Sequence, residues 1–120
     1  MLPSVNRMRR STDFATVVRT GVRARRGSVV VHHAALSSVP SPGCPPAAPI
    51  VGLVVGRSVG GSVVRHAVSR KLRAQLSCRI LALPAGTGTV VRALPNAATA
   101  TSAEFGRDLD AALAKIAAVR

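Results

Sequence analysis

Acidic residues are the scarcest feature of this sequence. Its 120 residues include only four aspartates and glutamates against seventeen lysines and arginines, which gives a formal net charge of +13. No carboxylate occurs between Phe14 and Ala103, although eleven arginines and lysines lie in that stretch. A surface with so much uncompensated positive charge repels itself, and the usual compensation is a polyanionic partner. The composition therefore favours nucleic acid or an anionic membrane surface as the partner.

The same scarcity argues against catalysis by the polypeptide. Glycoside hydrolysis and two-metal phosphoryl transfer both require clustered carboxylates. Three of the four acids, Glu104, Asp108 and Asp110, fall in one late segment, where they fit the first half of a helix. The histidines and cysteines show neither C-x2-C nor H-x3-H spacing, which zinc sites commonly use. We expect no catalytic residue in the polypeptide and no metal bound by it.

Aromatic residues, cysteines and long apolar runs are also rare. With Phe14 and Phe105 as the two aromatic residues, the core must be aliphatic, and an RNA-binding surface of stacked aromatics is disfavoured. No apolar run is long enough to cross a bilayer, which argues against a membrane protein. Cys44 and Cys78 fit a reducing compartment better than a disulfide scaffold, so we expect a cytoplasmic protein. The Arg-rich start resembles an organellar transit peptide, but the same basic bias continues through residue 92.

The remaining pattern predicts one α+β domain over residues 1–120. A basic, flexible segment is expected over 1–10, and a Pro-rich loop over 37–49. The expected elements are a helix within 11–21, strands over 28–36 and 50–56, a helix over 62–78, a strand over 89–94 and a final helix from Thr101 or Ser102. This order is typical of an α/β sandwich, in which helices pack on a small central β-sheet.

The stretch "SVVRHAVSRKLRAQL", residues 62–76, predicts an amphipathic helix with five basic residues and no acid. At 100° per residue, one arc of about 140° gathers its polar and basic side chains. These are Arg65, His66, Ser69, Arg70 and Arg73. An adjacent arc with Val64, Val68 and Leu72 suits packing on a sheet.

A solvated face is the ordinary explanation of such a stripe, but two features favour RNA binding. No counter-charge lies nearby in the sequence, and arginine suits bidentate contacts to phosphate. The glycine-rich loop "GRSVGG", residues 56–61, leads into the positive N-terminal end of the helix. Its backbone amides and Arg57 are further candidate phosphate contacts.

The segment "VVRHAVSRKLRAQL" resembles the signature helix of the protein subunit of bacterial ribonuclease P. Arg65, Arg70 and Arg73 match the family pattern in place. Three residues depart from it, because His66, Ala67 and Ser69 stand where asparagine, arginine and a basic residue are usual. Further similarity is carried by "NRMRRSTDF", "VGLVVGRSVGGSVVRH" and "VVRAL", which resemble the amino-terminal segment, the strand-loop-helix unit and the late strand of the family.

The resemblance implies an RNA-based enzyme that removes the 5′ leader of precursor tRNA. The RNA subunit would supply the active site and hold the Mg²⁺ ions, while the polypeptide alone would be inactive. The implied fold is an α/β sandwich like that of a ribosomal-protein domain, with a left-handed βαβ crossover. The implied leader-binding cleft lies between the first helix and the sheet. Its candidate residues are Phe14, Val18, Arg19 and His32. Val18 and His32 stand where aromatic residues are commoner in the family.

The expected partners are thus ribonuclease P RNA and precursor tRNA, with no DNA and no membrane. One alternative is a ribosomal or other structural RNA-binding protein without a link to catalysis. A DNA-binding helix-turn-helix is disfavoured, since no short helix precedes the basic one at the required spacing. For Phe14 a second interpretation is ordinary packing between the first helix and the sheet.

Overall fold

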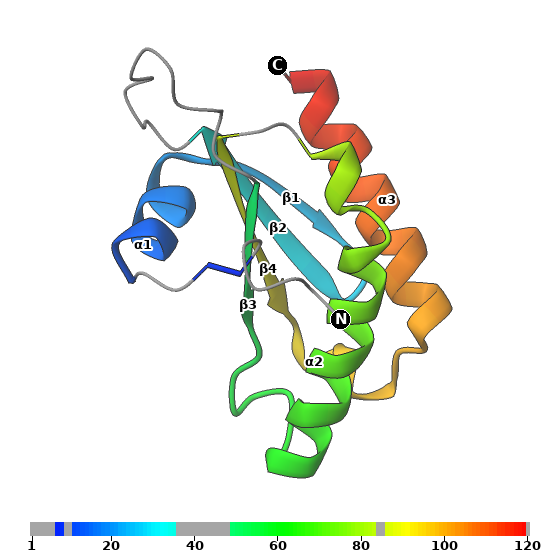
Figure 1. Ribbon diagram of the computed structural model, residues 1–120. Coiled ribbons are helices and arrows are strands. Elements are labelled where there is room, and N and C mark those ends of the chain that lie inside the picture. Colours follow the sequence, from blue (N-terminus) through cyan, green and yellow to red (C-terminus); the bar gives the residue numbers. More distant parts are fainter. Residues whose placement is uncertain (1–6, 9–10, 36–48, 84–85, 120) are drawn as a thin grey trace.

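The computed structural model describes residues 7–8, 11–35, 49–83 and 86–119, and it places three α-helices of this part of the chain on a four-stranded sheet (Figure 1). The elements are α1 (Ser11–Thr20), β1 (Val22–Arg26), β2 (Val29–Ala35), β3 (Ile50–Val54), α2 (Ser62–Ser77), η2 (Ile80–Ala82), β4 (Thr87–Ala93), η3 (Pro95–Thr99) and α3 (Ser102–Val119). The strand order is β1-β2-β4-β3. β1, β2 and β4 pair in antiparallel fashion, whereas β3 and β4 are parallel. The expected α+β class is confirmed.

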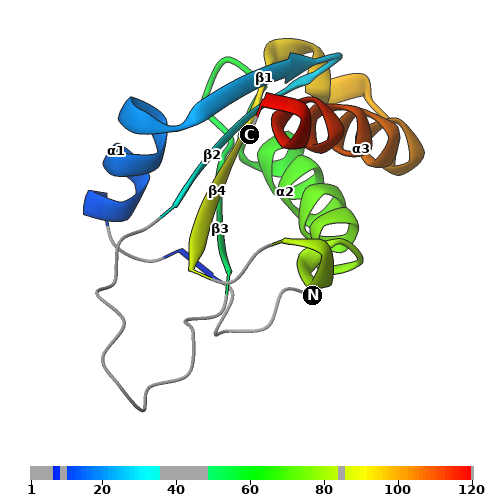
Figure 2. The same ribbon diagram turned by 90° about the horizontal axis from the view of Figure 1, so that it is seen from above.

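The helices cover the two faces of the sheet unequally. α2 and α3 lie on one face, and α1 lies on the other (Figures 1 and 2). Successive strand residues point to opposite faces, so each face has its own core. Val29, Val31 and Val91 belong to the core under α2 and α3, whereas Ala34 and Val90 belong to the smaller core under α1.

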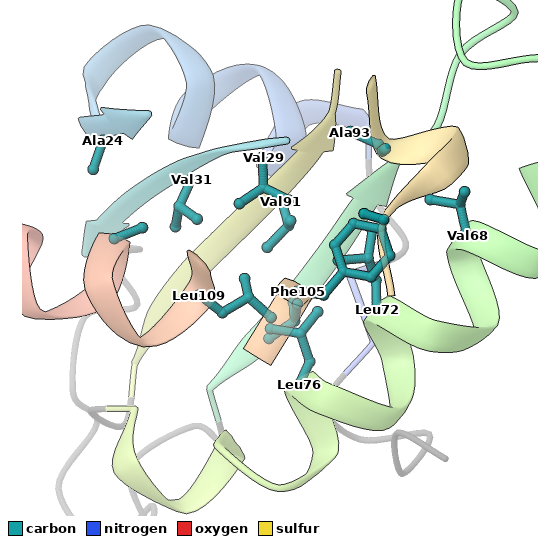
Figure 3. Close-up of a cluster of buried hydrophobic side chains, with 14 of the residues drawn as sticks. Ala24, Val29, Val31, Val68, Leu72, Leu76, Val91, Ala93, Phe105 and Leu109 are labelled. Carbon is teal, nitrogen blue, oxygen red and sulfur yellow. The ribbon is translucent and has the colours of Figure 1, made fainter. Parts of the chain in front are cut away.

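The larger core is mainly aliphatic, as the composition predicts. Figure 3 shows side chains of the sheet meeting side chains of α2 and α3. From α2 these are Val68, Leu72 and Leu76, and from α3 they are Phe105 and Leu109. Phe105 is fully buried and is the largest side chain of this core. The apolar arc of α2 thus packs on the sheet and leaves the basic arc outside the core.

β1 is a strand that the sequence analysis missed. Val22–Arg26 contains three arginines, and this charge hid the alternating pattern of a strand. The strand exposes the three arginines and buries Ala24. Gly27, with φ +52°, and Ser28 form a two-residue turn, so that Arg26 pairs with Val29. Glycine with positive φ at the first turn position is a common hairpin arrangement. Because β1 is an edge strand, its arginines also discourage pairing with other chains.

The other expected helices and strands are confirmed, with ends shifted by at most two residues. β3, α2 and β4 form the expected βαβ unit with parallel neighbouring strands, while the left-handed sense of its crossover stays a prediction. The segment after β4, where no helix or strand was predicted, contains the short helix η3. Residues 37–48 of the Pro-rich loop lie outside the described residues.

Two residues of the expected flexible N-terminus are held against the sheet. Arg7 forms a parallel bridge with Val51, and the backbone N–H of Met8 donates to the Val51 carbonyl oxygen at 2.9 Å. The Met8 side chain is buried in the smaller core. The rest of residues 1–10 lies outside the described part of the chain.

Candidate nucleic-acid interface

α2 presents its basic residues other than Lys71 away from α3. On the α3 side, Gln75 Nε2 donates to Ser102 Oγ at 2.8 Å, and Lys71 Nζ donates to the Ala100 carbonyl oxygen at 3.3 Å. The helical rotation of 100° per residue puts the other basic positions on the opposite flank and the outer surface. We call this surface the basic face of α2. It comprises Arg65, His66, Ser69, Arg70 and Arg73, the five residues that the sequence analysis selected.

The arginines on the basic face of α2 have no counter-charge in the described part of the chain. His66, Arg70 and Arg73 are exposed, while Arg65 is half-buried. Within the described residues, no hydrogen bond or ion pair is made by the three guanidinium groups, and Arg65 Nε is buried without a partner. The first turn of α2 contains no acid, and no side chain caps it. Such a surface attracts phosphate, since both the arginines and the helix N-terminus favour negative charge.

The loop between β3 and α2 carries Arg57, four positions before Gly61, the N-cap of α2. Arg57 is exposed, as expected of a phosphate contact. Gly60 has φ +154°, and a Cβ there would lie 3.0 Å from the Val64 side chain. Glycine at this position therefore allows the loop to pass closely over the first turn of α2.

A cleft of about 470 Å³ opens on the α1 face of the sheet. We call it the α1-side cleft. The residues that line it include Val18, Arg23, His32, Ser58, Arg92 and Pro95. Two of the four residues expected to bind the leader, Val18 and His32, thus meet in one cleft.

Phe14 and Arg19 are not among the residues that line the α1-side cleft. Phe14 is half-buried and packs with the smaller core, over Gly52 and beside Met8. A Cβ at Gly52 would overlap the Phe14 ring, so the glycine makes room for it. Arg19 is exposed in the last turn of α1. This placement favours the packing interpretation of Phe14.

Two arginines of the α1-side cleft, Arg23 and Arg92, were missed by the sequence analysis. Arg23 is paired with His32 across β1 and β2. Arg92 is paired with Val30, which precedes His32 by two positions on the same face of β2. Burial and then the charges of Arg23 and Arg92 lower the pKa of His32 below its usual value. The signal that could have found Arg23 was the Gly27–Ser28 turn, which folds residues 22–26 back onto β2.

His33, although adjacent to His32, has a structural role. Its side chain points to the opposite face of β2, as strand alternation requires. His33 Nδ1 lies 2.8 Å from Thr89 Oγ1, and both side chains are buried. His32 is therefore the histidine of this pair that is available to a ligand.

The carboxylates of α3 are engaged in separate structural contacts. Asp110 pairs with Arg79, and Asp108 Oδ2 accepts a hydrogen bond from the Ser28 backbone N–H at 3.4 Å. At the start of α3, Thr101 Oγ1 accepts a hydrogen bond from the Glu104 backbone N–H and donates one to Glu104 Oε1. Among the described residues, no group of three or more histidines, cysteines or carboxylates could hold a metal ion. These acids do not fit a catalytic magnesium site. No described helix is both long and apolar enough to span a membrane.

The fold and its two basic surfaces, where the described lining residues include no acid, define a class of protein: a small α+β protein suited to binding a polyanion. The family model described as Ribonuclease P matches residues 2–117. The chain belongs to the ribonuclease P protein family, whose members form part of the tRNA-processing ribonuclease P holoenzyme together with its RNA. This result decides between the two RNA-binding hypotheses, in favour of ribonuclease P over a ribosomal or other structural protein.

Curated relatives and solved structures agree with this assignment. The "Ribonuclease P protein component" of Streptomyces bikiniensis is 50% identical over 119 residues, covering 97% of this chain and 95% of its own. That of Mycobacterium sp. strain KMS is 48% identical over 113 residues, covering 94% and 91%. The RNase P protein of Staphylococcus aureus has a TM-score of 0.73 at 18% identity, covering 92% of this chain and 96% of its own. That of Thermotoga maritima has a TM-score of 0.71 at 20% identity, with the same coverage.

Proposed function

We propose that the basic face of α2 binds ribonuclease P RNA, and that the α1-side cleft binds the 5′ leader of precursor tRNA. The observation that carries this proposal is the placement of two basic surfaces on opposite faces of one sheet. α2 carries one surface and the other lies beside α1; these two helices lie on opposite sides of the sheet (Figure 2). Two RNA segments can therefore be bound at once without competing for the same side chains.

The loop between β3 and α2 connects the two surfaces. Ser58 lines the α1-side cleft, and Arg57 is its exposed neighbour in the chain. Gly61, at the end of the same loop, is the N-cap of α2. A substrate leader in the cleft would thus lie next to the protein segment that precedes the catalytic-RNA contact. This proximity supports a role in positioning the leader relative to the RNA active site.

On the basic face of α2, arginines would carry most of the affinity through phosphate contacts. His66 and Ser69 replace residues that are asparagine and a basic residue in the family pattern, so the Ser69 position adds no charge to this face. The contact should therefore depend on Arg65, Arg70 and Arg73 for its charge. Because these contacts go to phosphates, they position the protein on the RNA rather than read its bases.

The chemistry of leader removal is assigned to the RNA subunit. Mg²⁺ bound there supplies the metal-assisted hydrolysis, and precursor tRNA is the substrate. The polypeptide contributes binding and orientation, in keeping with the structural contacts that occupy the α3 carboxylates. We place this activity in the cytoplasm, a reducing compartment that suits the exposed free thiol of Cys78.

The test is holoenzyme assembly with charge-reversed variants. Arg70→Glu puts a carboxylate on the basic face of α2, and Arg107→Glu makes the same charge change at an exposed position of α3. We expect Arg70→Glu to weaken binding of ribonuclease P RNA at least tenfold more than Arg107→Glu, with leader cleavage at low magnesium lost in parallel. Equal effects of the two variants would contradict a specific contact at α2. Circular dichroism of both proteins controls for folding.

A further inference from the structure

The α1-side cleft contains three nitrogen-bearing side chains that the rest of the protein leaves unused. Among the described residues, the side chains of Arg23 and Arg92 make no hydrogen bond or ion pair. His32 is only 8% exposed, yet its Nδ1 atom is buried without a hydrogen-bond partner. Buried polar groups are normally paired, so an unpaired one calls for an explanation. Among the described residues, no hydrogen bond to Nδ1 fixes the orientation of this imidazole, which lines the cleft.

The ladder register places the three side chains around one position. Arg23 lies directly opposite His32, where cross-strand side chains are neighbours. Arg92 lies on the other side of β2, diagonal to His32. Two guanidinium groups therefore flank the imidazole from β1 and β4. The cleft volume of about 470 Å³ is in the range of small-ligand sites, so a nucleotide phosphate has room between them.

The charged residues on the elements around His32 are predominantly basic. β1 contributes Arg25 as well as Arg23 on this face, since Arg25 is paired with Val30. The β3–α2 loop contributes Arg57, next to Ser58. α1 contributes Arg19, while its single acid, Asp13, is five residues before Val18 and so near the other end of the helix. Among the described residues that line the cleft, none is a carboxylate.

We propose that Arg23, His32 and Arg92 form a phosphate clamp in the α1-side cleft, and that His32 takes up a proton when an RNA phosphate binds. This inference deepens the proposed function and rests on it, because it names how the leader is held. Where the family resemblance implies aromatic residues, the cleft of this chain has two arginines and a histidine. The leader is then held by its backbone rather than by stacked bases, so binding tolerates different leader sequences.

The proton uptake follows from electrostatics. In the free protein, burial and the two guanidinium groups disfavour the imidazolium, and the pKa of His32 is lowered. A phosphate between the guanidinium groups cancels their repulsion and attracts the imidazolium, so the pKa of His32 is higher in the complex than in the free protein. Binding that raises a pKa is strengthened as the pH falls. Affinity for the leader should therefore increase on acidification through the region below the ordinary histidine pKa of 6.5.

The experiment measures the affinity of the reconstituted holoenzyme for precursor tRNA and for mature tRNA, from about pH 5.5 to about pH 7.5. The ratio of the two affinities gives the contribution of the 5′ leader to binding. We expect the wild-type ratio to grow several-fold toward the lower pH, and His32→Gln to show a flat ratio. Arg23→Gln and Arg92→Gln should reduce the ratio at every pH. Both arginines are exposed, so these substitutions leave the core intact.

The outcomes distinguish leader binding in the α1-side cleft from proton uptake by His32. If the arginine variants reduce the ratio but His32→Gln keeps the wild-type pH dependence, the leader occupies the cleft and proton uptake by His32 is wrong. If neither the arginine nor the histidine variants change the ratio at any pH, the leader does not bind in this cleft, and the proposed function fails as well. Thermal unfolding of His32→Gln verifies its fold. Proton uptake measured by calorimetry in two buffers gives a second readout, with less uptake expected for Arg23→Gln.

Discussion

Arg79 Nε donates a hydrogen bond to Asp110 Oδ1 at 2.6 Å, and this ion pair ties the C-terminal end of α2 to α3. The same guanidinium also donates to the carbonyl oxygens of Gln75, at 2.8 Å, and Gly106, at 3.2 Å. The hydrogen bond from Arg79 lowers the pKa of Asp110. Asp110, one of the few acids of the chain, thus joins two helices. It does not neutralise the basic face of α2, whose charge remains available to a partner.

Removing this pair should affect stability and leave RNA binding nearly unchanged. The Asp110 side chain is 65% exposed, so Asp110→Asn should cost no more than about 1 kcal/mol. Arg79→Ala also removes the bonds to two carbonyl oxygens and should cost about 1–2 kcal/mol. Urea unfolding measures both values. The contribution of Asp110 is present above its ordinary pKa of 3.8 and is lost as the pH falls through its lowered folded value. A large loss of RNA affinity in either folded variant would contradict a purely structural role.

His32 should make the stability of the free protein sensitive to pH. Because the folded protein lowers the pKa of His32, the unfolded chain binds this proton first on acidification. Its contribution to stability is therefore complete above pH 6.5 and declines as the pH falls toward the lower folded pKa. Urea unfolding at about pH 7.5 and about pH 5.5 should show a smaller loss for His32→Gln than for wild type. His66→Gln, a change at an exposed histidine, is the matched control and should lose as much as wild type.

Periodicity in the sequence was sufficient to predict α2 and its basic face. Val68 and Leu72 recur at helical spacing, and their burial leaves Arg70 and Arg73 outside. The α1-side cleft was predicted only in part, because cross-strand neighbours depend on strand pairing. Arg23 comes next to His32 only through the hairpin that was missed.

The position of Phe14 depends on a different kind of information. Its ring lies over β3 because Gly52, far along the chain, lacks a side chain. Local sequence patterns around Phe14 cannot reveal this contact. The same limit applies to Arg92, whose place in the cleft follows from the register of β4 on β2. Helix faces are local properties of a sequence, whereas clefts on a sheet are set by tertiary pairing.

The packing of Phe14 on Gly52 can be tested with a pair of substitutions. Gly52→Ala would force its Cβ into the Phe14 ring and should destabilise the protein by about 1–3 kcal/mol. In the background of Phe14→Leu, the smaller side chain should relieve part of this cost. Urea unfolding of the two single variants and the double variant gives the coupling. Strictly additive losses would mean that the ring and the glycine do not constrain each other.

The basic face of α2 should determine how RNA binding responds to salt. A protein cation that neutralises a phosphate releases a counterion, so the logarithm of affinity falls linearly with the logarithm of salt concentration. Arg65→Ala, Arg70→Ala and Arg73→Ala should each reduce the magnitude of this slope by about one for ribonuclease P RNA. The variants would be compared with wild type by filter binding across a salt series.

Lys71→Ala is the control for this series, because it removes a positive charge from the same helix. The ammonium group of Lys71 donates to the Ala100 carbonyl oxygen, on the flank that faces η3 and α3. Lys71→Ala should therefore weaken RNA binding only slightly and leave the salt slope near the wild-type value. If Lys71→Ala changes the slope as much as Arg70→Ala does, the RNA senses the total charge of α2 rather than one face of it. A triple variant of Arg65, Arg70 and Arg73 that binds as tightly as wild type would place the RNA contact on another surface.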